Sequence, residues 1–92
     1  NGVDNRLISP ISQINNYTGK ISMITSANDQ HTKGRHIEGK AVDIRTNDNP
    51  GVMDFIKRTK RFVEKNKYGT LYTDGIYRYL DEGDHLHISL PQ

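Results

Sequence analysis

The sequence contains no cysteine, no tryptophan and only three prolines. Without cysteine the chain has no disulfide scaffold, no thiolate metal site and no cysteine nucleophile. No apolar run approaches the about 18–20 residues of a membrane span, and no signal peptide is visible. The charge is nearly balanced, with 13 basic and 11 acidic residues. The composition therefore does not indicate a nucleic-acid-binding protein.

Apolar residues are also scarce, at 33% of the 92 residues. The length accommodates one domain. A domain this small, with a thin core and no disulfide, commonly needs a metal ion or a partner for stability. We therefore expect a single domain over residues 1–92, cut from a longer protein because the sequence begins at Asn1 rather than Met.

The first half of the chain predicts one helix and two strands. Ser9 is the expected N-cap, with Pro10 at the first helical position and Gly19 closing the helix. Lys20–Ser26 is rich in β-branched residues and is predicted to be a strand. Ala41–Thr46 alternates in the same manner and is predicted to be a second strand.

The clearest helical pattern covers Pro50–Asn66. Its apolar stripe follows the spacing i, i+3, i+4, i+7, i+11 and consists of Val52, Phe55, Ile56, Thr59 and Val63. The opposite face of this predicted helix carries six positive charges, at Lys57, Arg58, Lys60, Arg61, Lys65 and Lys67. Such a face is ordinarily just solvated. No base-stacking motif accompanies it, so nucleic acid is the least favoured partner.

The remainder of the chain predicts antiparallel strands joined by short turns. Asp74-Gly75 and Asp81–Gly83 are the turns, and an Asp-Gly pair between two β-rich runs is a strong hairpin signal. The strands are Thr70–Thr73, Ile76–Leu80 and His85–Leu90. The predicted fold class is α+β, a small, mainly antiparallel sheet with two helices packed on it.

The four histidines fall in two short segments, His31 and His36 before one predicted strand, and His85 and His87 within the last. His85 and His87 project from the same face of a strand because side chains alternate. If the two strands are neighbours, His36 and Asp43 converge with one of this pair. Two imidazoles and a carboxylate suit zinc and leave a fourth position for water. The alternative is a solvent-facing polar row.

These segments resemble the two zinc motifs of the D-alanyl-D-alanine carboxypeptidase family of metallopeptidases, which is related to the murein endopeptidases and the hedgehog signalling domain. The pattern His-x-x-Gly-x-Ala-x-Asp-Ile covers residues 36–44, and the closing His-x-His-Ile covers residues 85–88. Ile24-Thr25-Ser26 resembles the strand before the first motif. The resemblance implies a hedgehog- and peptidase-like zinc fold with Zn²⁺ as cofactor.

The same resemblance assigns roles to individual residues. His36, Asp43 and His87 correspond to the zinc ligands of the family. His85 corresponds to the residue that hydrogen-bonds the reacting oxygen. The catalytic carboxylate often stands three positions before the last ligand in this family, so Asp84 is the expected catalytic residue here. The hedgehog-like spacing would instead favour Asp81 or Glu82.

The sequence departs from the family beside the first strand. Relatives often carry Ser-Gly-Tyr-Arg there, with an arginine that holds substrate, whereas this chain has Ser26-Ala27-Asn28-Asp29. Arg35 and His31 are the residues that we expect to replace it in substrate binding.

The resemblance implies a zinc-dependent hydrolase that cleaves a peptide bond in peptidoglycan stem peptides or cross-links. Such a carboxypeptidase or endopeptidase would act at the bacterial cell wall, outside the cytoplasm or on a virion, as an endolysin of a bacteriophage does. The alternative is a non-catalytic zinc-containing module of the same fold that binds a protein or a wall polymer. The motifs leave open which peptide bond is cut.

Overall fold

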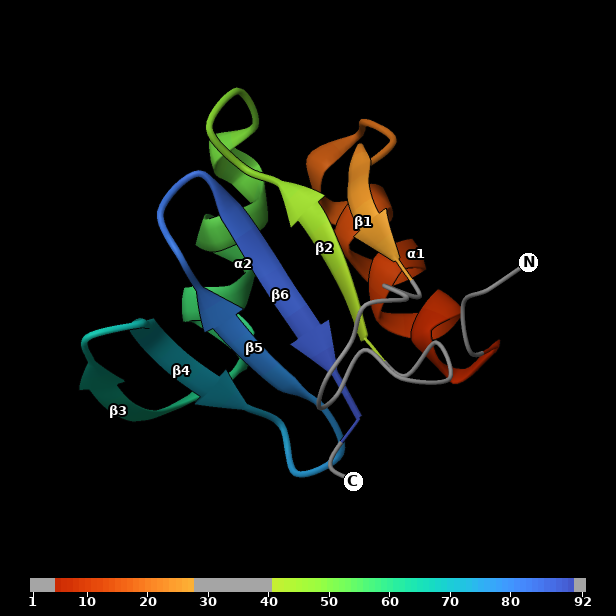
Figure 1. Ribbon diagram of the computed structural model, residues 1–92. Helices are drawn as coiled ribbons and strands as arrows, with labels where there is room; N and C mark the ends of the chain where they lie inside the picture. The colour runs from red at the N-terminus through yellow and green to blue at the C-terminus, as the bar shows by residue number, and fades with distance from the viewer. Residues whose placement is uncertain (1–4, 28–40, 91–92) are drawn as a thin grey trace.

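The computed structural model describes residues 5–27 and 41–90, which form a small α+β fold. The described elements begin with a short 3-10 helix at Asn5–Leu7. They continue with α1 (Ile8–Thr18), β1 (Ile24–Ala27), β2 (Ala41–Arg45), α2 (Pro50–Thr59), β3 (Arg61–Asn66), β4 (Gly69–Thr73), β5 (Arg78–Asp81) and β6 (His85–Ser89). The six strands pair antiparallel in the order β1-β2-β6-β5-β4-β3 (Figure 1). The predicted fold class is confirmed.

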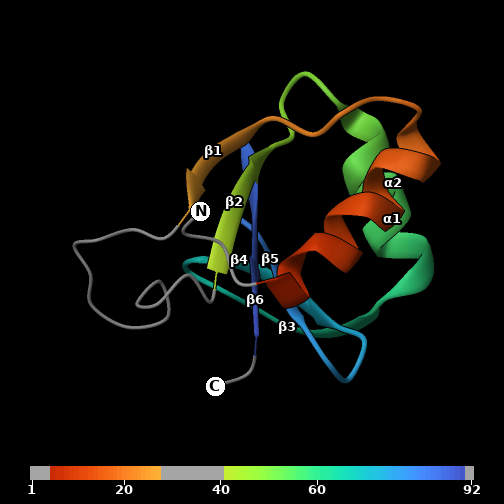
Figure 2. The same cartoon turned by 90° about the vertical axis from the view of Figure 1, so that its right-hand side faces the viewer.

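Both helices cover the same face of the sheet, and the core lies between these two layers (Figure 2). Alternate residues of the central strands β2 and β6 supply the sheet side of the core, and the helices supply the other side. The fully buried side chains include Val42, Ile44, Leu86 and Ile88 from the sheet and Ile14, Val52 and Ile56 from the helices. In the part of the chain that the structure describes, no helix has the length and apolar character of a membrane span.

The first helix begins at Ile8, two residues before Pro10, the first helical position that the sequence predicts. Ser9 is not the N-cap, because a 3-10 turn leads directly into Ile8 and places Ser9 in the first turn. Pro10 is tolerated there since the first helical N–H groups have no intrahelical partner. Gly19 closes the helix as predicted, with a left-handed φ of 75° and its N–H donating to the Asn15 carbonyl.

The first predicted strand is shorter than expected, because only Ile24–Ala27 pairs with β2. The side chain of Asn15 in α1 accepts hydrogen bonds from both the N–H and the hydroxyl of Ser22, at 2.8 and 2.6 Å. These bonds hold Ser22 to the helix. A β-rich composition alone did not predict this contact.

The prediction of one helix over Pro50–Asn66 is wrong in its second half. The helix ends at Thr59, whose hydroxyl donates to the Phe55 carbonyl, and Lys60 is extended. The following six residues form β3 and hydrogen-bond to β4 at the edge of the sheet. The apolar stripe is therefore interrupted: Val52 and Ile56 are buried in the core, but Val63 is exposed on β3.

The six positive charges consequently do not share a helix face. Lys57 and Arg58 lie at the end of α2, whereas Arg61 and Lys65 belong to β3. Lys60 is withdrawn from solvent, with a side chain that is only 7% exposed. The basic helix face predicted from the sequence is not present in this fold.

Lys60 belongs to a network centred on Asp74, at the turn between β4 and β5. Its ammonium lies 3.1 Å from the Asp74 carboxylate and 5.2 Å from the ring centroids of both Phe55 and Tyr79. The Tyr79 hydroxyl and the N–H groups of Ile76 and Tyr77 donate to the same carboxylate. Burial by itself would raise the pKa of Asp74, but these donors outweigh it and lower the pKa to about 2.

We expect Asp74→Ala to destabilise the fold by about 2–4 kcal/mol, because Lys60 and the buried Tyr79 hydroxyl lose their acceptor. Chemical denaturation measures this directly. The exposed Asp54→Ala, which disrupts a surface pair on α2, is the control and should cost much less, because solvent screens that pair. Since the folded pKa is lowered, the stabilisation by Asp74 is complete above its ordinary pKa of 3.8 and is lost as the pH falls toward 2. In Asp74→Ala the free energy of unfolding should therefore fall less steeply than in the wild-type protein as the pH is lowered from about 4 toward 2. An unchanged dependence on pH would contradict this role of Asp74.

Candidate metal centre

The candidate site lies on the face of the sheet that the helices leave open, where β2 and β6 run side by side. Asp43 of β2 is the direct cross-strand partner of His87 of β6. Because Val42, Ile44, Leu86 and Ile88 turn toward the helices, the residues between them turn to the open face. Adjacent antiparallel strands thus bring Asp43, His85 and His87 onto one surface, as the sequence predicts.

Asp43 and His87 are in contact. Nδ1 of His87 lies 2.7 Å from Oδ1 of Asp43. Both side chains are largely shielded from solvent, with 16% of His87 and 15% of Asp43 exposed. An imidazole nitrogen and a carboxylate oxygen held together in a shielded position are donor atoms that zinc accepts.

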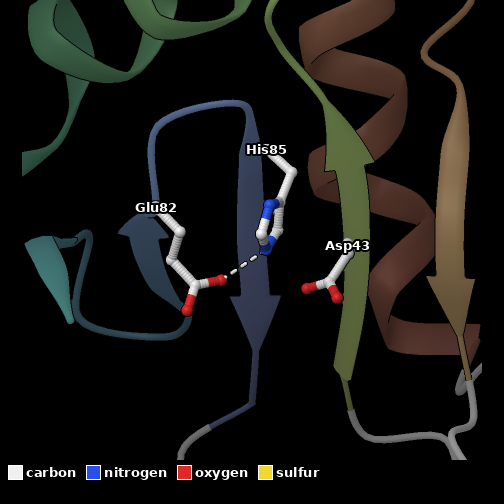
Figure 3. A group of neighbouring side chains, drawn as sticks. All are labelled: Asp43, Glu82 and His85. Atoms are coloured by element: carbon white, nitrogen blue, oxygen red, sulfur yellow. Dashed lines mark ion pairs between the residues drawn. The ribbon is translucent and has the colours of Figure 1, made fainter.

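A second carboxylate reaches the same place from the turn after β5. Oε1 of Glu82 lies 2.6 Å from Nε2 of His85, and Asp43 faces this pair across β6 (Figure 3). One donor atom from each of Asp43, Glu82 and His85 lies within 4.8 Å of the others. Asp43 therefore belongs to both groupings, one with His87 and one with Glu82 and His85.

His85 is bounded by acidic groups on both sides of its ring. Its Nδ1 lies 2.7 Å from Oδ1 of Asp84, opposite the contact with Glu82. Partial burial alone would lower the pKa of His85, but the hydrogen bond to Asp84 and the charges of Glu82, Asp43 and Asp84 outweigh it and raise that pKa. An imidazole with a carboxylate on each nitrogen is suited to donate hydrogen bonds.

The three carboxylates that the sequence offers as catalytic residues are placed differently. The side chain of Asp84 is 74% exposed, and that of Glu82 is 28% exposed. The hydrogen bond to His85 lowers the pKa of Asp84, so it is a charged partner on the outer side of that ring. Asp81 accepts the Gly83 N–H across its own turn, at 3.0 Å. Of the three, Glu82 lies within the group formed with Asp43 and His85.

The turn that presents Glu82 is fixed by a close backbone approach. Gly69, at the start of β4, has a φ of 149°, and a Cβ there would stand 2.1 Å from the Asp81 carbonyl oxygen. Only glycine allows β4 to pass this close to the end of β5. The position of Glu82 therefore depends on a residue thirteen positions away in the sequence.

Three residues that the sequence singles out lie outside the described residues: His36, the remaining predicted zinc ligand, and His31 and Arg35, the predicted substrate-binding residues. The structure adds a residue that the sequence analysis overlooked. Arg78 of β5 lines a hollow of about 250 Å³ together with Glu82 and His87. Alternation along β5 places Arg78 on the same face as Leu80, the cross-strand partner of His87, which is the signal that could have identified it.

Comparison with known proteins adds no assignment, because no protein-family model, no curated protein and no solved structure matches the chain. The two motifs and the geometry of the open face are therefore the features of the chain that bear on its function. Carboxylate and imidazole donors within hydrogen-bond distance, with a further carboxylate and imidazole beside them, are compatible with a zinc site.

Proposed function

We propose that this chain is a zinc-dependent peptidase that cleaves a peptide bond in stem peptides or cross-links of peptidoglycan. The proposal combines the resemblance to the D-alanyl-D-alanine carboxypeptidase family and its fold with the arrangement of the open face. It also implies action at the bacterial cell wall, by a cellular or phage-encoded protein. In this proposal Asp43 and His87 are zinc ligands, and His36 completes the set on the strength of the first motif.

The observation that carries the proposal is the contact between Asp43 and His87. These residues are 44 positions apart in sequence, yet the strand register sets them directly opposite each other, with donor atoms 2.7 Å apart. An ion pair alone would explain this contact. It would not explain why a second carboxylate and a second imidazole, Glu82 and His85, converge on the same point.

The chain's own residues supply acid–base groups for hydrolysis. When bound, zinc provides Lewis-acid activation of a water molecule and of the substrate carbonyl. Glu82 accepts a proton from the water molecule while the oxygen of that water bonds to the carbonyl carbon. Glu82 then delivers this proton to the amine nitrogen as the carbon–nitrogen bond breaks. Once Glu82 carries the proton, the N–H at Nε2 of His85 is released from it and donates a hydrogen bond to the oxyanion that forms between the two steps. Asp84, at Nδ1, keeps the His85 ring oriented.

Zinc removal tests the proposal directly. We expect the dialysed protein to take up one zinc ion per chain and to release peptides from purified peptidoglycan only when zinc is present. A chelator should abolish release, and added zinc should restore it. Because a ligand that binds only the folded state stabilises it, zinc at 100 times its Kd should contribute about 2.7 kcal/mol. For a chain of this size that raises Tm by about 10–20 °C.

The outcomes of this experiment separate the two functions that the sequence left open. Mass spectrometry of the released products identifies the bond that is cut. One bound zinc with no turnover on any stem peptide would contradict the peptidase and favour a non-catalytic zinc module. No zinc uptake, measured by elemental analysis after dialysis, would contradict both.

A further inference from the structure

A hollow on the open face adjoins the candidate metal centre. Glu82, His87 and Arg78 line it, and Leu71 and Leu80 contribute apolar surface. Its volume is about 250 Å³, less than the roughly 300–1,000 Å³ of pockets that hold a whole ligand. The hollow is therefore suited to one small residue at the end of a longer substrate.

The strand register fixes how far Arg78 stands from the reacting groups. Leu80 is the cross-strand partner of His87, and Arg78 is the partner of Ser89, two residues further along the same face. Two strand residues span about 7 Å, and each residue of an extended peptide spans about 3.5 Å. A group bound by Arg78 lies one or two residues from the bond that His87 and Glu82 face.

Arg78 is also the arginine best placed to receive an anion. Arg45 lies 3.9 Å from Asp48, and Arg58 lies 3.1 Å from Asp54, so both already have carboxylate neighbours. Arg78 makes no ion pair with another residue of the described ranges 5–27 and 41–90. A guanidinium forms two parallel hydrogen bonds with a carboxylate, which gives both charge and orientation to the recognition.

The role of Glu82 decides which part of the substrate enters the hollow. Glu82 delivers a proton to the leaving amine, so the residue that carries this amine must lie beside Glu82. The hollow is the space on that side. We propose that Arg78 determines specificity by binding a free carboxylate on the residue that leaves, an inference that rests on the proposed peptidase function.

Peptidoglycan offers this carboxylate from two sources. One is the C-terminal α-carboxylate of a D-Ala-D-Ala end, and the other is the free α-carboxylate of a γ-linked D-Glu after L-Ala. Each source has a neutral counterpart, a C-terminal amide or the isoglutamine form. The wild-type protein should cleave the acid of one pair about 10- to 100-fold more efficiently than its amide, and the pair that shows this preference identifies the source.

Arg78→Gln should reduce kcat/KM for the preferred acid about 10- to 100-fold, mainly through KM, and should leave the rate on the amide unchanged. Arg78→Lys should recover part of the loss because it keeps the charge. Arg61→Gln is the matched control, since Arg61 lies on the edge strand β3, two strands from β5, and does not line this hollow. Equal cleavage of acid and amide by the wild-type protein would overturn the role of Arg78 and leave the peptidase intact.

A binding measurement separates failure of this inference from failure of the peptidase. Isothermal titration of metal-free protein with N-acetyl-L-Lys-D-Ala-D-Ala, and with a γ-D-Glu dipeptide, should show at least about tenfold tighter binding of one acid than of its amide. Arg78→Gln should lose this difference. If the acid were bound more tightly than its amide but no cleavage occurred in the presence of zinc, the role of Arg78 would be supported and the peptidase function contradicted. If acid and amide were bound equally well, or cleaved equally well, the proposed role of Arg78 would be contradicted.

Discussion

Asp43→Asn is expected to abolish stoichiometric zinc binding and, with it, cleavage of peptidoglycan. Asp43 faces His87 at 2.7 Å and also belongs to the group with Glu82 and His85. Loss of a residue that only orients a metal ligand costs about 10- to 100-fold in affinity. Loss of the central ligand itself should cost more than that. Elemental analysis after dialysis and isothermal titration with zinc measure the change.

Asparagine keeps the shape of the side chain and can still hydrogen-bond to His87, so Asp43→Asn should remain folded. The matched control is Asp54→Asn, which alters an exposed aspartate on α2 that pairs with Arg58 and should leave zinc binding unchanged. If Asp43→Asn retained one zinc with the wild-type affinity, Asp43 would not be a ligand, and the contact with His87 would be an ordinary ion pair. Circular dichroism of both variants excludes unfolding as the cause of a loss.

The two central strands could be predicted from the sequence because the alternation of their apolar and polar residues matches the two faces of the sheet, one against the helices and one open. Val42 and Ile44 in β2, and Leu86 and Ile88 in β6, are fully buried, whereas the polar residues between them, Asp43 and His87, are partly exposed. Alternation of this kind indicates which side chains share the open face. It does not specify which residue of one strand faces which residue of the other. The pairing of Asp43 with His87 required the register.

The prediction of one helix over Pro50–Asn66 failed for a different physical reason. Residues 61–66 continue a helical spacing through Val63, and their charged side chains are as compatible with an exposed helix as with an edge strand. What makes them a strand is pairing with β4, a contact that no local pattern contains. An edge strand with every residue exposed has no buried face to leave a period-two signal.

The sequence favoured Asp84 over Asp81 and Glu82 as the catalytic carboxylate, on the spacing of the resembled motif alone. All three lie within six residues of His87, and spacing alone allows each of them. The turn places the three side chains differently: Asp81 accepts a hydrogen bond from the Gly83 N–H, while Oε1 of Glu82 lies 2.6 Å from Nε2 of His85. Asp84 faces a second hollow, beside Arg45 and away from Glu82.

We therefore expect Glu82→Gln to lower kcat about 10²- to 10⁴-fold, the usual contribution of a positioned acid–base group. Zinc stoichiometry should be unchanged, because the proposed ligands remain. Asp84→Asn is the paired variant: it removes a mostly exposed charge that contacts only the outer nitrogen of His85, so its effect on kcat should be much smaller. Initial rates on a defined muropeptide, with zinc content measured on the same samples, compare the two.

Other outcomes for these two variants would assign different roles to Glu82 and Asp84. If Asp84→Asn were inactive and Glu82→Gln fully active, the base would be Asp84, and His85 would have to rotate for that carboxylate to reach the substrate. If Glu82→Gln lost zinc together with activity, Glu82 would be a ligand rather than the base, since its oxygen already lies within 4.8 Å of donor atoms of Asp43 and His85. The pH dependence of kcat separates these cases. Loss of a base removes the acidic limb of the profile, whereas loss of a ligand with zinc at saturation lowers activity without removing that limb.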